Sequence, residues 1–99
     1  MKRSLRVLPR AEAELADAID WYESRRAGLG ADLLELADNA FERILEAPHQ
    51  LGTWKTGRRE YSRFLLDRFP YAVLYTYDDL EVVIVAFAHC RRKPGYWLK

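Results

Sequence analysis

The side chains best suited to chemistry gather near the end of the chain. His89 closes an apolar segment, Arg91 and Arg92 follow it, and Tyr96 and Trp97 come shortly afterwards. A histidine that titrates near neutrality can shuttle protons in phosphodiester cleavage, and arginines can hold a phosphate through paired hydrogen bonds. A structural alternative is a strand-end histidine bonded to a backbone carbonyl, followed by a solvated tail that Trp97 pins to the sheet. This cluster is the candidate site.

Motifs for other chemistries are missing. The segment that contains Gly28 and Gly30 is too short to match a phosphate-binding loop. No serine stands in a known catalytic arrangement with a histidine. With His49, His89 and Cys90 as the only soft ligands, we expect no metal site and no cofactor. A single cysteine cannot close an internal disulfide and fits a reducing compartment. Strand parity predicts that Cys90 points into the core, opposite to His89.

Composition predicts one globular domain spanning residues 1–99, because the chain is 49% hydrophobic and 31% charged. No apolar run approaches the ~18 residues of a membrane span. The basic N-terminus lacks the apolar core of a signal peptide, so we expect a cytoplasmic protein. The net charge of +1 hides ten acids against three bases between Ala11 and Ala47, with basic segments on both sides. We expect the helical carboxylates to form a solvated surface.

Apolar periodicity predicts an α+β domain in the order β-α-α-β-β-β. Helical spacing predicts one helix from Pro9 to Arg26 and a second that follows the Leu29-Gly30 link and is stopped by Pro48. So short a link forces an antiparallel hairpin. Alternating patterns predict four strands, at Ser4–Leu8, Arg59–Leu66, Tyr71–Tyr77 and Val82–Cys90, with a loop from His49 to Gly57. The helical hairpin should pack on one face of a small, mostly antiparallel four-stranded sheet.

The register of the last hairpin predicts two apolar sheet faces. A turn at Asp78-Asp79 pairs Tyr77 with Leu80, Tyr75 with Val82, and Val73 with Ile84. One face then carries Tyr75, Ile84 and Ala86, and the other carries Leu74, Val85, Phe87 and His89. A single helical hairpin covers only one face. Either the N-terminal strand and the tail fold over the second face, or a partner protein covers it, and we favour a partner.

Three segments resemble the toxins of the RelE/ParE superfamily. Ala16–Tyr22 followed by Gly28-Leu29-Gly30 looks like their helical hairpin, and Arg68–Tyr75 resembles their phenylalanine-proline-tyrosine strand. Val82–Pro94 resembles their last strand and its basic exit. The resemblance extends from about residue 5 to residue 97. It implies the toxin of a type II toxin–antitoxin module, in a hetero-oligomeric complex whose antitoxin wraps over the toxin and would cover the second apolar face.

The superfamily has two branches, one that cleaves mRNA on the ribosome and one that poisons DNA gyrase. The ribonuclease branch carries cations on its second to fourth strands and a tyrosine in the tail, and Arg63, Arg91 and Tyr96 match some of these places. Ala72, however, stands where that branch has an arginine, and Leu65 where a lysine is expected. We therefore expect a gyrase inhibitor of the ParE type rather than an enzyme.

The alternatives assign different roles to the same residues. In a gyrase inhibitor, His89, Arg91, Arg92, Tyr96 and Trp97 would contact the target. In a ribosome-dependent mRNA endonuclease, the catalytic residues would be His89, Arg91, Arg63 and Tyr96. A third alternative is a non-toxic protein-interaction module. Aromatic residues elsewhere, such as Trp54, offer a further surface for stacking or contact.

Overall fold

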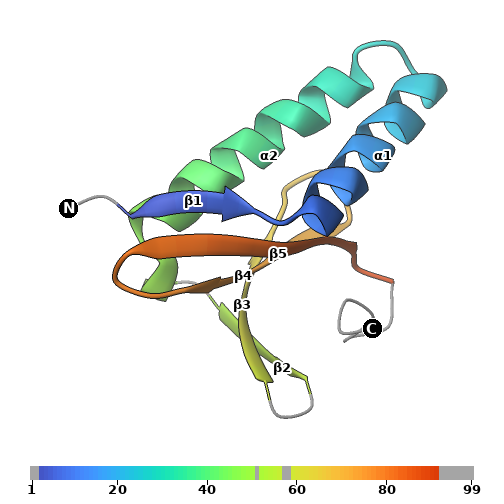
Figure 1. Cartoon of the computed structure of the whole chain (residues 1–99). Helices are drawn as coiled ribbons and strands as arrows, with labels where there is room; N and C mark the ends of the chain where they lie inside the picture. Colours follow the sequence, from blue (N-terminus) through green and yellow to red (C-terminus); the bar gives the residue numbers. More distant parts are fainter. Residues whose placement is uncertain (1–2, 51, 57–58, 92–99) are drawn as a thin grey trace.

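The computed structural model describes residues 3–50, 52–56 and 59–91. Its elements are β1 (Ser4–Val7), α1 (Pro9–Arg25), α2 (Leu29–Glu46), the short 3-10 helix η1 (Pro48–Gln50), β2 (Gly52–Thr56), β3 (Arg59–Leu65), β4 (Tyr71–Tyr77) and β5 (Glu81–His89). The strands form one sheet in the order β1-β5-β4-β3-β2 (Figure 1). β1 is parallel to β5, and the other neighbours are antiparallel. The predicted fold class and the β-α-α-β-β-β order are confirmed.

The segment predicted as a loop between helix and sheet is instead η1 followed by a fifth strand. β2 pairs with β3 from Gly52 opposite Arg63 to Thr56 opposite Arg59. Threonine and tryptophan favour strands, and β3 has a free edge beside them. The two glycines that suggested a loop stand at the start of this strand and just beyond its end. The predicted four-stranded sheet therefore gains one further strand, β2, beside β3.

The two helices form the predicted antiparallel hairpin (Figure 1). Pro9 starts α1, where its missing N–H loses no hydrogen bond. Gly28 lies between the helices with φ 90°, in the left-handed region that glycine tolerates best. The Glu23 carboxylate accepts hydrogen bonds from the N–H groups of Gly28 at 3.0 Å and Gly30 at 2.9 Å. A side chain of α1 thus caps the first turn of α2.

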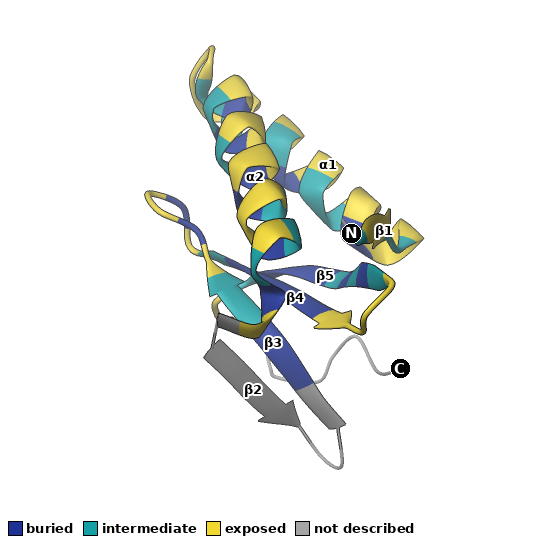
Figure 2. Ribbon diagram, turned by 90° about the vertical axis from the view of Figure 1, so that its left-hand side faces the viewer, coloured by how far each residue is buried: buried dark blue, intermediate teal, exposed yellow. Residues whose placement is uncertain are grey.

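The hairpin covers one face of the sheet and builds the main core there (Figure 2). Leu33 and Ile44 of α2 pack in one cluster with Tyr75 and Ile84 of the sheet, and all four are fully buried. The Tyr75 hydroxyl donates a buried hydrogen bond of 2.7 Å to the Pro48 carbonyl. This bond ties the start of η1 to the middle of the sheet.

The predicted register between β4 and β5 is wrong by two residues near the turn. Tyr77 pairs with Val82, and Tyr75 pairs with Ile84, because the chain reverses over Asp78–Glu81 and the Asp78 carboxylate accepts from the N–H groups at 80 and 81. Farther along, a β-bulge at Val85 shifts the pairing so that Leu74 faces Ala86. A bulge inverts the in–out alternation beyond it.

The bulge corrects the assignment of residues to faces. Phe87 belongs to the cluster under the helices, although it was predicted on the other face, and Ala86 belongs to the opposite face. His89 pairs with Tyr71 and shares the helix-side face with Phe87. The predicted association of His89 with Phe87 is confirmed, but both side chains lie on the side of α1.

The middle of the second sheet face, for which a partner was favoured as the cover, is buried within the chain itself. Tyr61, Leu74, Ala86 and Ala88 form a cluster in which no residue is more than 4% exposed, and Val85 packs against it. Two of these residues are alanines, whose side chains present so little apolar area that little structure is needed to bury them. These four residues therefore need no partner protein to cover them.

Candidate functional site

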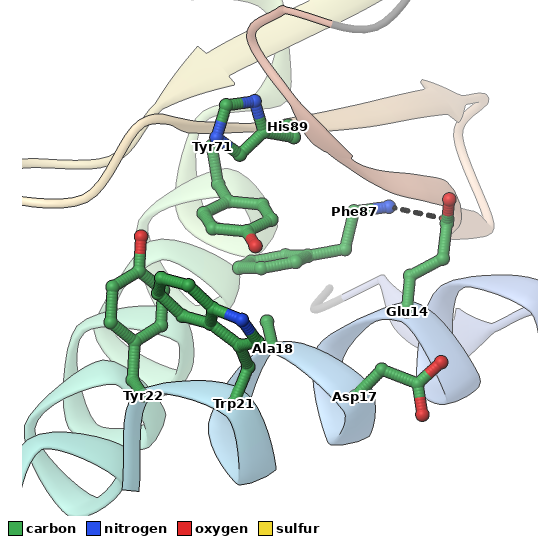
Figure 3. A pocket seen from close by; sticks show the side chains of 8 residues that line it. All are labelled: Glu14, Asp17, Ala18, Trp21, Tyr22, Tyr71, Phe87 and His89. Carbon is green, nitrogen blue, oxygen red and sulfur yellow. Dashed lines mark hydrogen bonds between the residues drawn. The ribbon is translucent and has the colours of Figure 1, made fainter. Parts of the chain in front are cut away.

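A groove of about 390 Å³ lies between α1 and the adjoining ends of β4 and β5 (Figure 3). α1 contributes one wall and the strands contribute the other. Its lining residues are Glu14, Asp17, Ala18, Trp21, Tyr22, Tyr71, Phe87 and His89. The groove therefore combines aromatic rings with two carboxylates and the histidine of the predicted site.

Aromatic contacts fix the walls of the groove. Tyr71 stacks on Phe87 with ring centroids 4.8 Å apart, and it meets His89 edge to face at 5.2 Å. Trp21 meets Tyr22 edge to face at 4.8 Å, yet 51% of Trp21 remains exposed. Burial, with a smaller effect from Tyr22, raises the pKa of Tyr71, so its hydroxyl stays protonated at neutral pH. The groove thus presents rigid apolar area and a phenol donor.

The Glu14 carboxylate stands in for a neighbouring strand at the edge of β5. β1 pairs with β5 only as far as Ile84, and among the described residues no strand continues the pairing along this edge. The Glu14 Oε1 atom accepts a hydrogen bond of 3.1 Å from the Phe87 N–H (Figure 3). A charged acceptor satisfies this backbone group and discourages pairing with a foreign strand.

Asp17 is the second carboxylate of the groove and is exposed to solvent. Within the described part of the chain, no hydrogen bond or ion pair occupies it. A cation entering the groove would therefore find this carboxylate available.

The structure brings two of the predicted site residues together. The His89 Nδ1 atom accepts a hydrogen bond of 3.1 Å from the Arg91 N–H, so neutral His89 carries its proton on Nε2. Arg91 is exposed where the chain turns after β5. Cys90 is also exposed rather than pointing into the core, because β5 ends at His89 and strand parity no longer applies. Arg92, Tyr96 and Trp97 lie outside the described residues.

Arg63 lies on the other side of the sheet from His89. It pairs with Leu74 of the second cluster, whereas His89 pairs with Tyr71 on the helix side. Ala72 is 2% exposed, and Leu65 is 54% exposed on the same face as Arg63. The described chain therefore does not gather Arg63, His89 and Arg91 around one point.

Sequence reasoning missed the groove because it treated the acids of α1 as a solvated surface. Glu14, Ala18 and Trp21 follow one helical stripe, at spacings of four and three residues, and Asp17 flanks it. This mixture of acid, small and aromatic residues was a usable signal. What the sequence did not reveal was that the bulge at Val85 would turn Phe87 and His89 toward that stripe.

Within the described part of the chain, no three histidine, cysteine, aspartate or glutamate side chains come together as metal ligands. Among the same residues, no helix is both long enough and apolar enough to cross a membrane.

The fold defines a small α+β protein in which a helical hairpin covers one face of a mixed sheet. A solved structure described as the chromosomal ParDE TA system from P. aeruginosa has this fold, with a TM-score of 0.76 over 89% of this chain and 96% of that chain, at 15% sequence identity. The sequence model of the ParE toxin of type II toxin–antitoxin systems, parDE, matches residues 5–94. The chain belongs to the ParE toxin family. A comparison with curated proteins finds no match.

Membership of this family confirms the predicted resemblance and the class of protein. The matched range includes every residue that lines the groove, together with Arg91. A toxin of this class works with an antitoxin, so the predicted protein partner is supported at that level. The identity of the target is a separate question.

Proposed function

We propose that this protein arrests growth in the cytoplasm by inhibiting DNA gyrase, and that a cognate antitoxin neutralises it in a hetero-oligomeric complex. The proposal is carried by the match to the ParE toxin family over residues 5–94. The fold shared with a ParDE system, at a TM-score of 0.76, is consistent with it.

The placement of cations favours gyrase inhibition over RNA cleavage. Cleavage of a phosphodiester requires several donors preorganised around one phosphate. Arg63 lies across the sheet from His89, and Ala72 and Leu65 supply no charge on the Arg63 face. A ribosome-dependent endonuclease is therefore the less favoured alternative.

The proposed target contacts lie at the end of β5. His89 and Arg91 are adjacent there, and the sequence continues with Arg92, Tyr96 and Trp97. Arginine can form paired hydrogen bonds with carboxylates or phosphates, and aromatic rings supply contact area with few rotatable bonds. This chemistry suits a contact with a protein–DNA complex.

A pair of assays on the purified chain tests the mechanism. We expect inhibition of DNA supercoiling by gyrase, and intact mRNA in a translating ribosome reaction. Cleaved mRNA with unaffected supercoiling would replace the proposal with the endonuclease alternative.

Growth measurements test the toxin role itself. Expression of the chain alone should arrest growth, and co-expression of the protein from the adjacent reading frame should restore it. Normal growth with a verified folded product would leave only an interaction module.

A further inference from the structure

We infer that the groove between α1 and β5 binds an arginine or lysine side chain of the antitoxin, and that the bound segment covers His89. This inference rests on the proposed function, because it assigns a docking site to the neutralising partner. It concerns the helix side of the sheet, where the groove lies, because the central cluster of the second face is already buried within the chain.

The composition of the groove selects a cation. Glu14 and Asp17 line the same groove as Trp21 and Phe87 (Figure 3). Glu14 is held by the Phe87 N–H, whereas the Asp17 carboxylate has no ion pair in the described part of the chain. Aromatic faces attract cations, and a nearby carboxylate adds to that attraction.

The Trp21 ring already contacts one guanidinium of the chain. The Arg25 guanidinium carbon lies 4.4 Å from the centroid of the Trp21 ring. Half of Trp21 nevertheless stays exposed, and the groove extends from it to Tyr71 and His89. A second cation, supplied by a partner, therefore has aromatic surface left to contact.

The position of His89 favours the antitoxin over the target as the occupant. A nucleic acid would bring its phosphates toward Glu14 and Asp17, which repel them. His89 lines the groove and also belongs to the proposed target contact. A segment seated in the groove would compete with the target for His89, and competition of this kind neutralises a toxin.

Charge reversal at Asp17 tests the site. We expect Asp17→Lys to weaken the affinity for the antitoxin by roughly tenfold or more in titration calorimetry, because like charges then face each other. Trp21→Ala should weaken it as well through lost contact area. Asp38→Lys is the matched control, since Asp38 is an exposed aspartate of α2 that does not line the groove, and its affinity should equal that of the unmodified chain.

A charge swap identifies the partner side chain. Each arginine and lysine of the antitoxin is changed to glutamate in turn, and one such variant should bind the Asp17→Lys toxin at least ~10-fold better than the unmodified antitoxin does. Unchanged affinity for Asp17→Lys and Trp21→Ala would overturn the inference. So would a change in the oligomeric state of the toxin alone with no change in antitoxin affinity, because the groove would then hold a second copy.

The experiments test the proposed function and the groove assignment separately. Failure of the unmodified chain to bind the antitoxin would overturn the proposed partner, and the groove assignment with it. Tight binding of the unmodified chain with unaffected variants would overturn only the groove assignment. Growth arrest by the toxin alone does not depend on either result.

Discussion

At the scale of single residues, Tyr75 joins the sheet to the segment that follows α2. Its hydroxyl donates a buried hydrogen bond of 2.7 Å to the Pro48 carbonyl. We expect Tyr75→Phe to lower the free energy of unfolding at pH 7 by about 1–3 kcal/mol, because the carbonyl loses its partner in a buried position. Urea unfolding measures this loss. Tyr77→Phe is the control, since Tyr77 is 39% exposed, and a loss of equal size there would contradict the assignment.

The same residue predicts a pH dependence. Desolvation raises the pKa of Tyr75 from 10.0 to about 12. Because the folded value is the higher one, the linked stability is fully present below pH 10 and is lost as the pH rises toward 12. The free energy of unfolding should therefore fall as the pH rises from 10 toward 12. In Tyr75→Phe, the free energy of unfolding should depend less on pH across this range than in the unmodified chain. An unchanged dependence on alkaline pH would contradict the prediction.

At the scale of elements, the start of α2 depends on a side chain of α1. Glu23 accepts hydrogen bonds from the N–H groups of Gly28 and Gly30. We expect Glu23→Ala to lower the free energy of unfolding by about 1–2 kcal/mol, because the first turn of α2 loses its capping acceptor. Thermal unfolding measures the effect. Asp20→Ala on the same helix should stay within about 0.5 kcal/mol of the unmodified chain, and equal effects at the two sites would argue against a capping role.

Gly30 sets the distance between the two helices. An added Cβ would lie 2.8 Å from the Ile19 carbonyl oxygen, which belongs to the backbone and cannot easily move away. We expect Gly30→Ala to lower the free energy of unfolding by about 1–3 kcal/mol, although alanine favours helices. Thermal unfolding of this variant should show a lower midpoint, and a raised midpoint would mean that the helices separate without cost.

The second sheet face gives a further test at the element scale. Leu74 is fully buried there, whereas Leu65 on the same face is 54% exposed. Leu74→Glu should therefore lose more than about 3 kcal/mol of folding free energy, because it buries an unpaired carboxylate. Leu65→Glu should remain folded. Circular dichroism and urea unfolding distinguish the two, and a stable Leu74→Glu protein would show that this face is open to solvent.

At the scale of the whole molecule, substitutions at the end of β5 should remove toxicity without unfolding the protein. His89 is half-buried and Arg91 is exposed, so removing both side chains leaves the main core intact. We expect the double variant His89→Ala with Arg91→Ala to lose growth arrest while its unfolding midpoint changes little. Growth curves and thermal unfolding of the same preparations measure both properties.

A matched double variant controls for lost charge. His49→Ala with Arg43→Ala removes the same two residue types at exposed positions on and after α2. This control should keep full toxicity. Full toxicity in the His89 and Arg91 variant would remove the target contact from the end of β5, and attention would then move to Trp54 and the segment before β3.

The sequence by itself determined the order of the two helices and of four of the five described strands, because helical and alternating periodicities are local properties of the chain. Pro9, Gly28 and Pro48 place the limits of the helices through their own backbone restrictions. The segments that resemble the RelE/ParE toxins also indicated the family, which the match over residues 5–94 confirms. His89 and Arg91 were named from residue type alone, and the structure places them together.

Only the tertiary structure decided which residues face one another. The β-bulge at Val85 adds one residue to β5, so it reverses the faces of Phe87 and His89 in a way that simple alternation does not predict. That reversal creates the groove with Asp17 and separates His89 from Arg63. The burial of Leu74 likewise depends on contacts between distant segments. Periodicity identifies an element and its apolar side, whereas register and burial depend on how the elements pair across the chain.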